Sequence, residues 1–106
     1  MSIFGDSITG PDGGVYIRSA GGLHTPDGGT YLRNGNIISS PRGGVIILSG
    51  NATTLADGRM VFRSGDIWQG PKGAYILSGG VLTGPDGRMW RGVRSEDVPI
   101  LIDRDA

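Results

Sequence analysis

The residues best suited to bind a ligand are tyrosines, arginines and a tryptophan that recur at similar places along the chain. Tyr16 is followed two residues later by Arg18, and Tyr31 is followed by Arg33 in the same way. Aromatic rings stack on sugars or bases, and the planar guanidinium group of arginine binds acidic groups through paired hydrogen bonds. Tyrosine and arginine also stabilise a sheet by pairing across its strands, which is the structural alternative. We predict a ligand or partner face composed of Tyr16, Arg18, Tyr31, Arg33, Arg63, Tyr75 and Trp90.

The residues that catalysis or metal binding would need are few. The chain has one histidine, His24, one glutamate, Glu96, and no cysteine, so disulfides and thiolate metal sites are excluded. His24 precedes a turn and has no counterpart elsewhere, which favours a surface role. Aspartates recur only where turns favour them for backbone reasons, at Asp12, Asp27, Asp57 and Asp86. We therefore predict that the protein is not an enzyme and holds neither a metal nor a cofactor.

These side chains are carried on a unit of about 15 residues that repeats six times. Each copy contains a turn of the Pro-Asp-Gly type, in which proline presets φ and glycine takes the positive φ that follows. Such a turn with a glycine bulge joins the strands of a short β-hairpin. The six turns span residues 10–13, 25–28, 40–43, 55–58, 70–73 and 84–87, with spacings of 15 residues and a final spacing of 14.

A short run of β-branched and aromatic residues follows each turn, and a second glycine-containing turn leads into another short run. Both connections are too short for a parallel crossover. The pattern predicts an all-β protein, an antiparallel meander or solenoid of six β-hairpin repeats without any helix. A small closed up-and-down barrel and a parallel β-helix are the alternatives.

The two faces of the predicted strands differ in composition. One face is almost purely apolar, and we predict that it forms the core: Val15, Ile17, Thr30, Leu32, Val45, Ile47, Met60, Phe62, Ala74, Ile76 and Met89. The other face is mixed and joins Ile46, Leu48 and Val61 to the tyrosines and arginines. Because a single flat sheet would leave one face in water, we expect the sheet to coil, to close or to pair with another copy.

The repeat ends near residue 92. We expect a β-hairpin repeat domain over residues 1–92 and a different C-terminal segment over residues 93–106. The run Val98-Pro99-Ile100-Leu101-Ile102 is apolar and starts near a proline, which suits an edge strand. It predicts a strand that caps the sheet or, alternatively, pairs with a partner chain.

The overall composition of the chain argues against some classes of binding partner. The formal net charge is zero, which argues against general nucleic-acid binding or attachment to a membrane surface. Residues 1–6 lack the basic and apolar regions of a signal peptide, so we expect a cytoplasmic protein or one exported without a classical signal. We expect a non-enzymatic interaction or structural module that binds a protein partner or another copy of itself. The alternative is a module that binds a glycan or another small polar ligand on its Tyr/Arg/Trp face.

Overall fold

The computed structural model describes residues 7–19 and 21–105. This part of the chain forms twelve short strands and two helical segments. The strands are β1 (Ser7–Thr9), β2 (Val15–Ser19), β3 (Gly22–His24), β4 (Thr30–Asn34), β5 (Ile37–Ser39), β6 (Val45–Ser49), β7 (Ala52–Thr54), β8 (Met60–Ser64), β9 (Ile67–Gly70), β10 (Gly73–Ser78), β11 (Val81–Thr83) and β12 (Met89–Arg91). A 3-10 helix, η2 (Ser95–Asp97), leads directly into α1 (Val98–Asp105).

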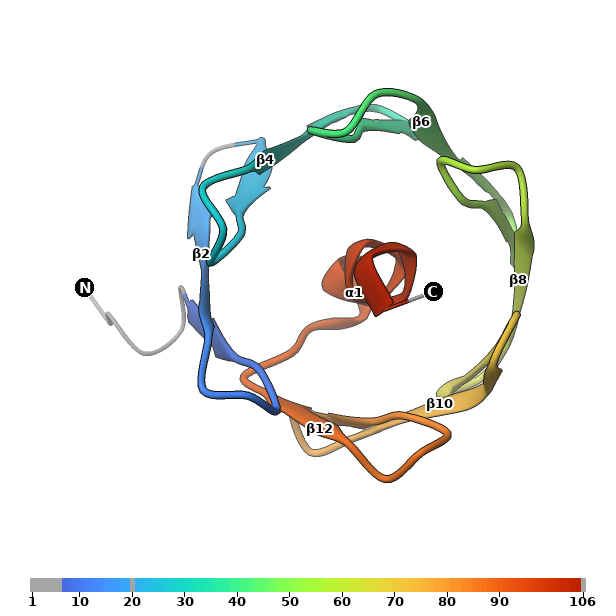
Figure 1. The fold of residues 1–106 in the computed structure, drawn as a ribbon. Helices are drawn as coiled ribbons and strands as arrows, with labels where there is room; N and C mark the ends of the chain where they lie inside the picture. Colours follow the sequence, from blue (N-terminus) through green and yellow to red (C-terminus); the bar gives the residue numbers. More distant parts are fainter. Residues whose placement is uncertain (1–6, 20, 106) are drawn as a thin grey trace.

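The strands form one antiparallel sheet that closes on itself as a barrel (Figure 1). Each strand pairs with its neighbours in sequence, and β1 closes the ring by pairing with β12 through Thr9 and Arg91. The predicted antiparallel hairpin meander is therefore confirmed, in the closed form that the sequence left as an alternative. The parallel β-helix is wrong, because neighbouring strands run in opposite directions.

The Pro-Asp-Gly turns have the expected geometry. The Gly13 amide donates to the Gly10 carbonyl over 3.1 Å, and Gly13 has a φ of 88°, which an L side chain would strain. The Asp12 carboxylate accepts a hydrogen bond from the Gly14 amide at 3.1 Å, so this aspartate serves the turn itself. In the fifth copy Gly70 pairs directly with Gly73. This tighter connection explains why the following spacing is 14 residues.

The C-terminal run is a helix, so the prediction of a strand over Val98–Ile102 was wrong. Figure 1 shows α1 in the middle of the ring, surrounded by the barrel wall. Val98, Leu101 and Ile102 are fully buried there. Inside a barrel the segment meets apolar side chains on every side, and a helix satisfies its own backbone hydrogen bonds where no strand edge is available.

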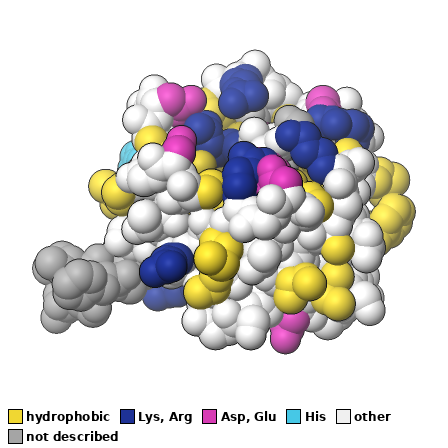
Figure 2. Space-filling model, turned by 60° about the horizontal axis from the view of Figure 1, so that its bottom comes forward, with side chains coloured by type: hydrophobic (Ala, Val, Ile, Leu, Met, Phe, Trp, Pro, Cys, Tyr) yellow, Lys and Arg dark blue, Asp and Glu magenta, His cyan; other side chains and the backbone are white. Residues whose placement is uncertain are grey.

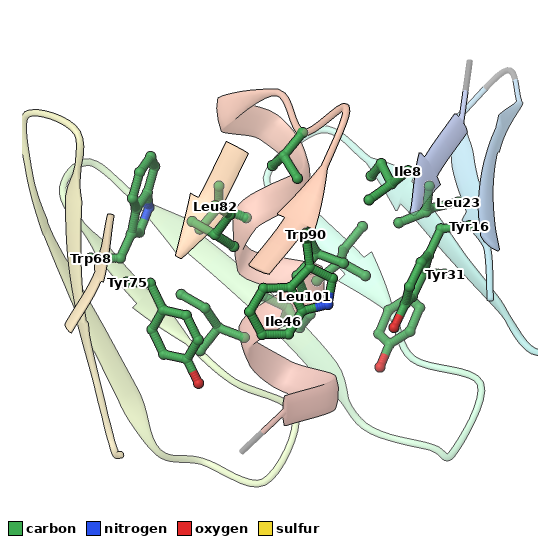
Figure 3. Packing of buried hydrophobic residues seen from close by; sticks show 14 of the residues in the cluster. Ile8, Tyr16, Leu23, Tyr31, Ile46, Trp68, Tyr75, Leu82, Trp90 and Leu101 are labelled. Carbon is green, nitrogen blue, oxygen red and sulfur yellow. The ribbon is translucent and has the colours of Figure 1, made fainter. Parts of the chain in front are cut away.

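The strand face that points into the barrel is the opposite of the predicted one. Tyr31, Ile46 and Tyr75 belong to the mixed face and are fully buried, whereas Ile17 and Leu32 belong to the apolar face and are more than half exposed. The predicted core is therefore wrong. The interior of a barrel of about eight strands is just wide enough to be filled by the side chains of its own strands. Twelve strands leave a wider interior, and large aromatic rings together with α1 fill it (Figure 3).

The expectation about a signal peptide concerns residues 1–6, which lie outside the described part of the chain. Within that part, neither helical segment has the length and hydropathy needed to cross a membrane.

Candidate functional site

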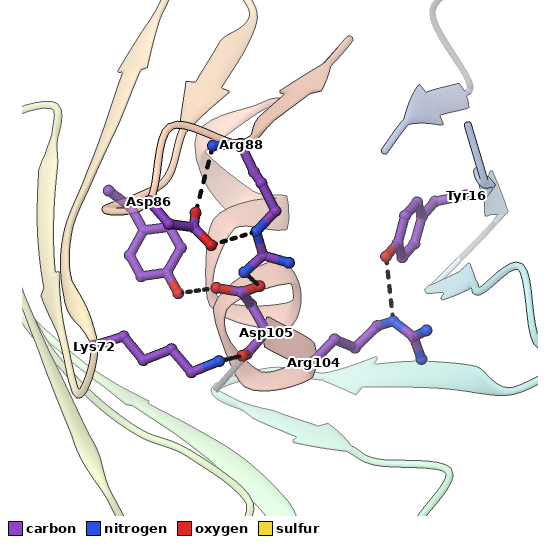
Figure 4. Close-up of polar contacts among 7 residues, drawn as sticks. Tyr16, Lys72, Asp86, Arg88, Arg104 and Asp105 are labelled. Carbon is purple, nitrogen blue, oxygen red and sulfur yellow. Dashed lines mark hydrogen bonds and ion pairs between the residues drawn. The ribbon is translucent and has the colours of Figure 1, made fainter. Parts of the chain in front are cut away.

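The three tyrosines of the predicted ligand face each contact a polar residue of α1 near its C-terminus. The Tyr31 hydroxyl donates to Asp103 Oδ2 at 2.9 Å, and the Tyr75 hydroxyl donates to the Asp105 carboxylate. Figure 4 shows the contacts around Asp105, together with the hydrogen bond that Arg104 Nε donates to the Tyr16 hydroxyl at 3.3 Å. The repeat therefore supplies one phenol for each of three successive helix residues.

Further polar contacts complete this C-terminal anchor of α1. Asp103 also accepts the Ala56 amide at 3.0 Å, which ties the helix to the turn after β7. The Arg88 guanidinium pairs with the Asp105 carboxylate, and the Lys72 ammonium donates to the Asp105 carbonyl (Figure 4). Buried carboxylates need such partners, because an unpaired charge in the interior is costly.

An ion pair anchors the other end of the helical segment. Arg18 Nε donates to Asp97 Oδ2 at 2.9 Å, and both side chains are largely buried. The same carboxylate oxygen accepts the Arg94 amide at 2.9 Å. Arg18 of the predicted face thus fixes the start of α1 rather than facing an open surface.

The pKa values of Tyr31 and Tyr75 are raised by their place in this anchor. Burial, helped by the nearby Asp103 carboxylate, raises the pKa of Tyr31 from 10.0 to about 12. Burial and the hydrogen bond to Asp105 also raise the pKa of Tyr75. Both shifts favour the neutral phenol, which can donate to the carboxylate.

We expect the protein to lose stability between about pH 10 and pH 12. A raised phenol pKa stabilises the folded state fully below the unfolded pKa of 10.0, and this contribution disappears as the pH approaches the folded pKa of about 12. Urea unfolding across this range would measure the loss. The double variant Tyr31→Phe, Tyr75→Phe should show a shallower decline, and parallel curves for the two proteins would contradict the assignment.

The remaining residues of the predicted face divide between the core and the rim. Trp90 is buried beside Tyr75, with ring centroids 6.2 Å apart. Arg33 and Arg63 remain exposed at the end of the barrel where α1 begins. They line a hollow of about 520 Å³ between the barrel wall and the start of α1. Five of the seven predicted residues therefore lie inside the barrel, and two face an open hollow.

The histidine of the predicted turn lies between two hydroxyl groups. His24 Nε2 lies 3.0 Å from the Ser19 hydroxyl, and its Nδ1 lies 2.9 Å from the Thr30 hydroxyl. A hydroxyl thus occupies the place that a carboxylate takes in a Ser-His-Asp arrangement. Within residues 7–19 and 21–105, no three residues of types that bind metals lie close enough to share an ion.

Sequence reasoning missed the helix residues Asp103, Arg104 and Asp105 as partners of the tyrosines. A signal for the helix is present in retrospect. Val98–Ile102 is apolar without alternation, which suits a helix buried on all sides as well as a strand. Pro99 lies in the first turn of α1, and Ser95, Glu96 and Asp97 come just before the helix. Proline, serine and acidic residues at these places are typical of a helix N-terminus.

Comparisons of the chain with protein families, curated proteins and solved structures give no match. The functional argument below therefore depends on the geometry of this chain alone.

Proposed function

We propose that the protein is a non-enzymatic structural or interaction module that associates with further copies of itself through the outer wall of the barrel. The observation that carries the proposal is the exposure of large apolar side chains on that wall. Eleven of them are between 38% and 56% exposed: Val15, Ile17, Leu32, Ile37, Val45, Ile47, Met60, Phe62, Ile67, Ile76 and Met89.

The outer wall also lacks charge. Side chains alternate between the two faces of each strand, and among the outward positions of the twelve described strands only Arg91 carries a formal charge. In Figure 2 hydrophobic side chains lie over the side wall, and most charged side chains in view gather at the upper rim. Identical copies can therefore approach wall to wall without the repulsion between like charges that usually opposes self-association.

The apolar side chains adjoin one another across strands. Ile37 lies directly opposite Ile47, Phe62 opposite Ala52, and Ile67 opposite Ile76. Exposed apolar side chains that adjoin one another in this way are typical of protein–protein contact surfaces, whereas single exposed apolar residues are ordinary.

The sector from β6 to β10 is the best contact surface. It carries Val45, Ile47, Met60, Phe62, Ile67 and Ile76, together with short serine and threonine side chains between them. A two-fold contact between two copies would use this same sector on both, so one surface complements itself. We therefore assign the partner as a second copy of the chain.

Light scattering coupled to size-exclusion chromatography tests the proposal. We expect the wild-type mass to exceed that of one chain, and Phe62→Glu to weaken association at least about tenfold, because a charge would then be buried in the contact. Thr9→Glu is the matched control. Thr9 pairs with Val15 of β2, and β2 and β8 lie on opposite sides of the ring (Figure 1). A wild-type protein that stays monomeric at high concentration would refute self-association, as would equal weakening by the two variants.

A further inference from the structure

The hollow at the start of α1 has the composition of an anion-binding site. Arg33, Leu48 and Arg63 line it from the barrel wall, and Ser95, Glu96 and Pro99 line it from the helical segment. Its volume of about 520 Å³ is in the range of small-molecule sites. The three wall residues are equivalent positions of successive repeats, so the repeat itself places two arginines on either side of a leucine.

Both arginines are held in place without being neutralised. Arg63 Nε donates to the Gly65 carbonyl at 2.8 Å, and its guanidinium carbon lies 4.6 Å from the centre of the Trp68 ring. Arg33 Nε donates to the Gly35 carbonyl at 3.2 Å. Among residues 7–19 and 21–105, neither arginine forms an ion pair with a carboxylate. Their other N–H donors are therefore available to a ligand in an orientation that is already ordered.

The equivalent arginine of the first repeat shows the contrast. Arg18 is committed to Asp97, and this ion pair is largely buried. Within the described part of the chain, no carboxylate forms an ion pair with Arg63 or Arg33. Glu96 also lines the hollow, but its carboxylate lies 3.9 Å from Arg94 and is about half exposed. The charge of the hollow is therefore positive, with two arginines against one glutamate.

A second hollow continues the positive surface around the rim. It has a volume of about 470 Å³, shares Arg33 and Glu96 with the first, and adds Arg18, Arg94 and Asp97. Arg33 stands at the boundary between the two. A ligand bound in the first hollow thus experiences the field of four arginines and two acids.

We propose that the hollow between α1 and the wall binds a small molecule that carries two anionic groups, one at Arg33 and the other at Arg63. Guanidinium groups match the oxygens of phosphates and carboxylates, and such charge-assisted hydrogen bonds are strong. Two groups are required because β4 and β8 are four strands apart, roughly 19 Å along the wall. Asn36 and Ser49 add polar lining, and Leu48 and Pro99 offer apolar contact to the body of the ligand.

Calorimetric titration with α,ω-alkanediol bisphosphates and with α,ω-alkanedicarboxylates of increasing chain length, at constant ionic strength, tests the proposal and separates the two chemistries. We expect submillimolar binding of at least one probe, and binding at least about tenfold weaker in the double variant Arg33→Gln, Arg63→Gln. The matched control is Arg42→Gln, Arg91→Gln, which removes the same charge from exposed positions outside the hollow. Binding of the bisphosphates alone would assign phosphates, and binding of the dicarboxylates alone would assign carboxylates.

Two results would overturn the proposal. One is the absence of binding to any of these probes at millimolar concentration by a wild-type protein whose melting curve shows that it is folded. The other is equal weakening by both double variants, which would mean that only the overall charge attracts the anions. Because the two arginines lie inside the rim and not on the outer wall, the outcome is independent of whether the barrel self-associates.

Discussion

Replacing Leu101 by aspartate should abolish cooperative folding of the barrel. Leu101 is fully buried in α1, and Figure 3 shows it among the large side chains of the barrel wall. A carboxylate at this position would have apolar neighbours, and burying an unpaired charge costs several kcal/mol or more. A small domain has only about 5–15 kcal/mol of stability to lose. Circular dichroism and urea unfolding would detect the loss.

The matched control is Leu32→Asp, the same substitution on the outer wall. The Leu32 side chain is 56% exposed, so the new carboxylate remains in water. We expect the free energy of unfolding to change by less than about 1 kcal/mol. If Leu101→Asp unfolded at the same urea concentration as Leu32→Asp, the helix would not lie inside the barrel.

The second large effect distinguishes two adjacent isoleucines of β6. Ile46 points into the barrel and is fully buried, whereas Ile47 points outward and is 44% exposed. We expect Ile46→Ala to lower the free energy of unfolding by about 2–5 kcal/mol, because the lost methyl groups leave a cavity. Ile47→Ala should cost less than about 1 kcal/mol. Urea unfolding of the two variants beside the wild type measures both values.

This pair tests which strand face is the core. The apolar alternation of the sequence favours Ile47 as the core residue, and the closed barrel favours Ile46. A larger loss for Ile47→Ala in the monomeric protein would therefore contradict the barrel as described. The comparison must be made below the concentration at which copies associate, since Ile47 also lies in the proposed contact sector.

For the Tyr/Arg/Trp face, the residue types predicted the kind of group that the tyrosines bind but not where that group comes from. Its tyrosines do form hydrogen bonds with charged groups, but those groups are Asp103, Arg104 and Asp105 of the same chain. A sequence pattern indicates what a side chain can bind without indicating what lies opposite. The last turn of α1 occupies the position at which the sequence predicts an external ligand.

Local chemistry determined the repeating part of the fold. Pro-Asp-Gly turns constrain the backbone within four residues, and β-branched and aromatic runs favour strands, so hairpins at a 15-residue interval could be predicted from neighbouring residues alone. The antiparallel direction follows from the same short connections. None of these features needs information from distant parts of the chain.

Only the tertiary structure decided which face is inside, that the sheet closes, and that the last apolar run is a helix. Each depends on residues far apart in sequence: β1 must reach β12, and Asp103 must meet Tyr31. A period of two residues marks two faces without saying which one is enclosed. Closure gives that answer, because twelve strands surround a space that the tyrosine and tryptophan rings and a helix fill, and the face without those rings is left on the outer wall.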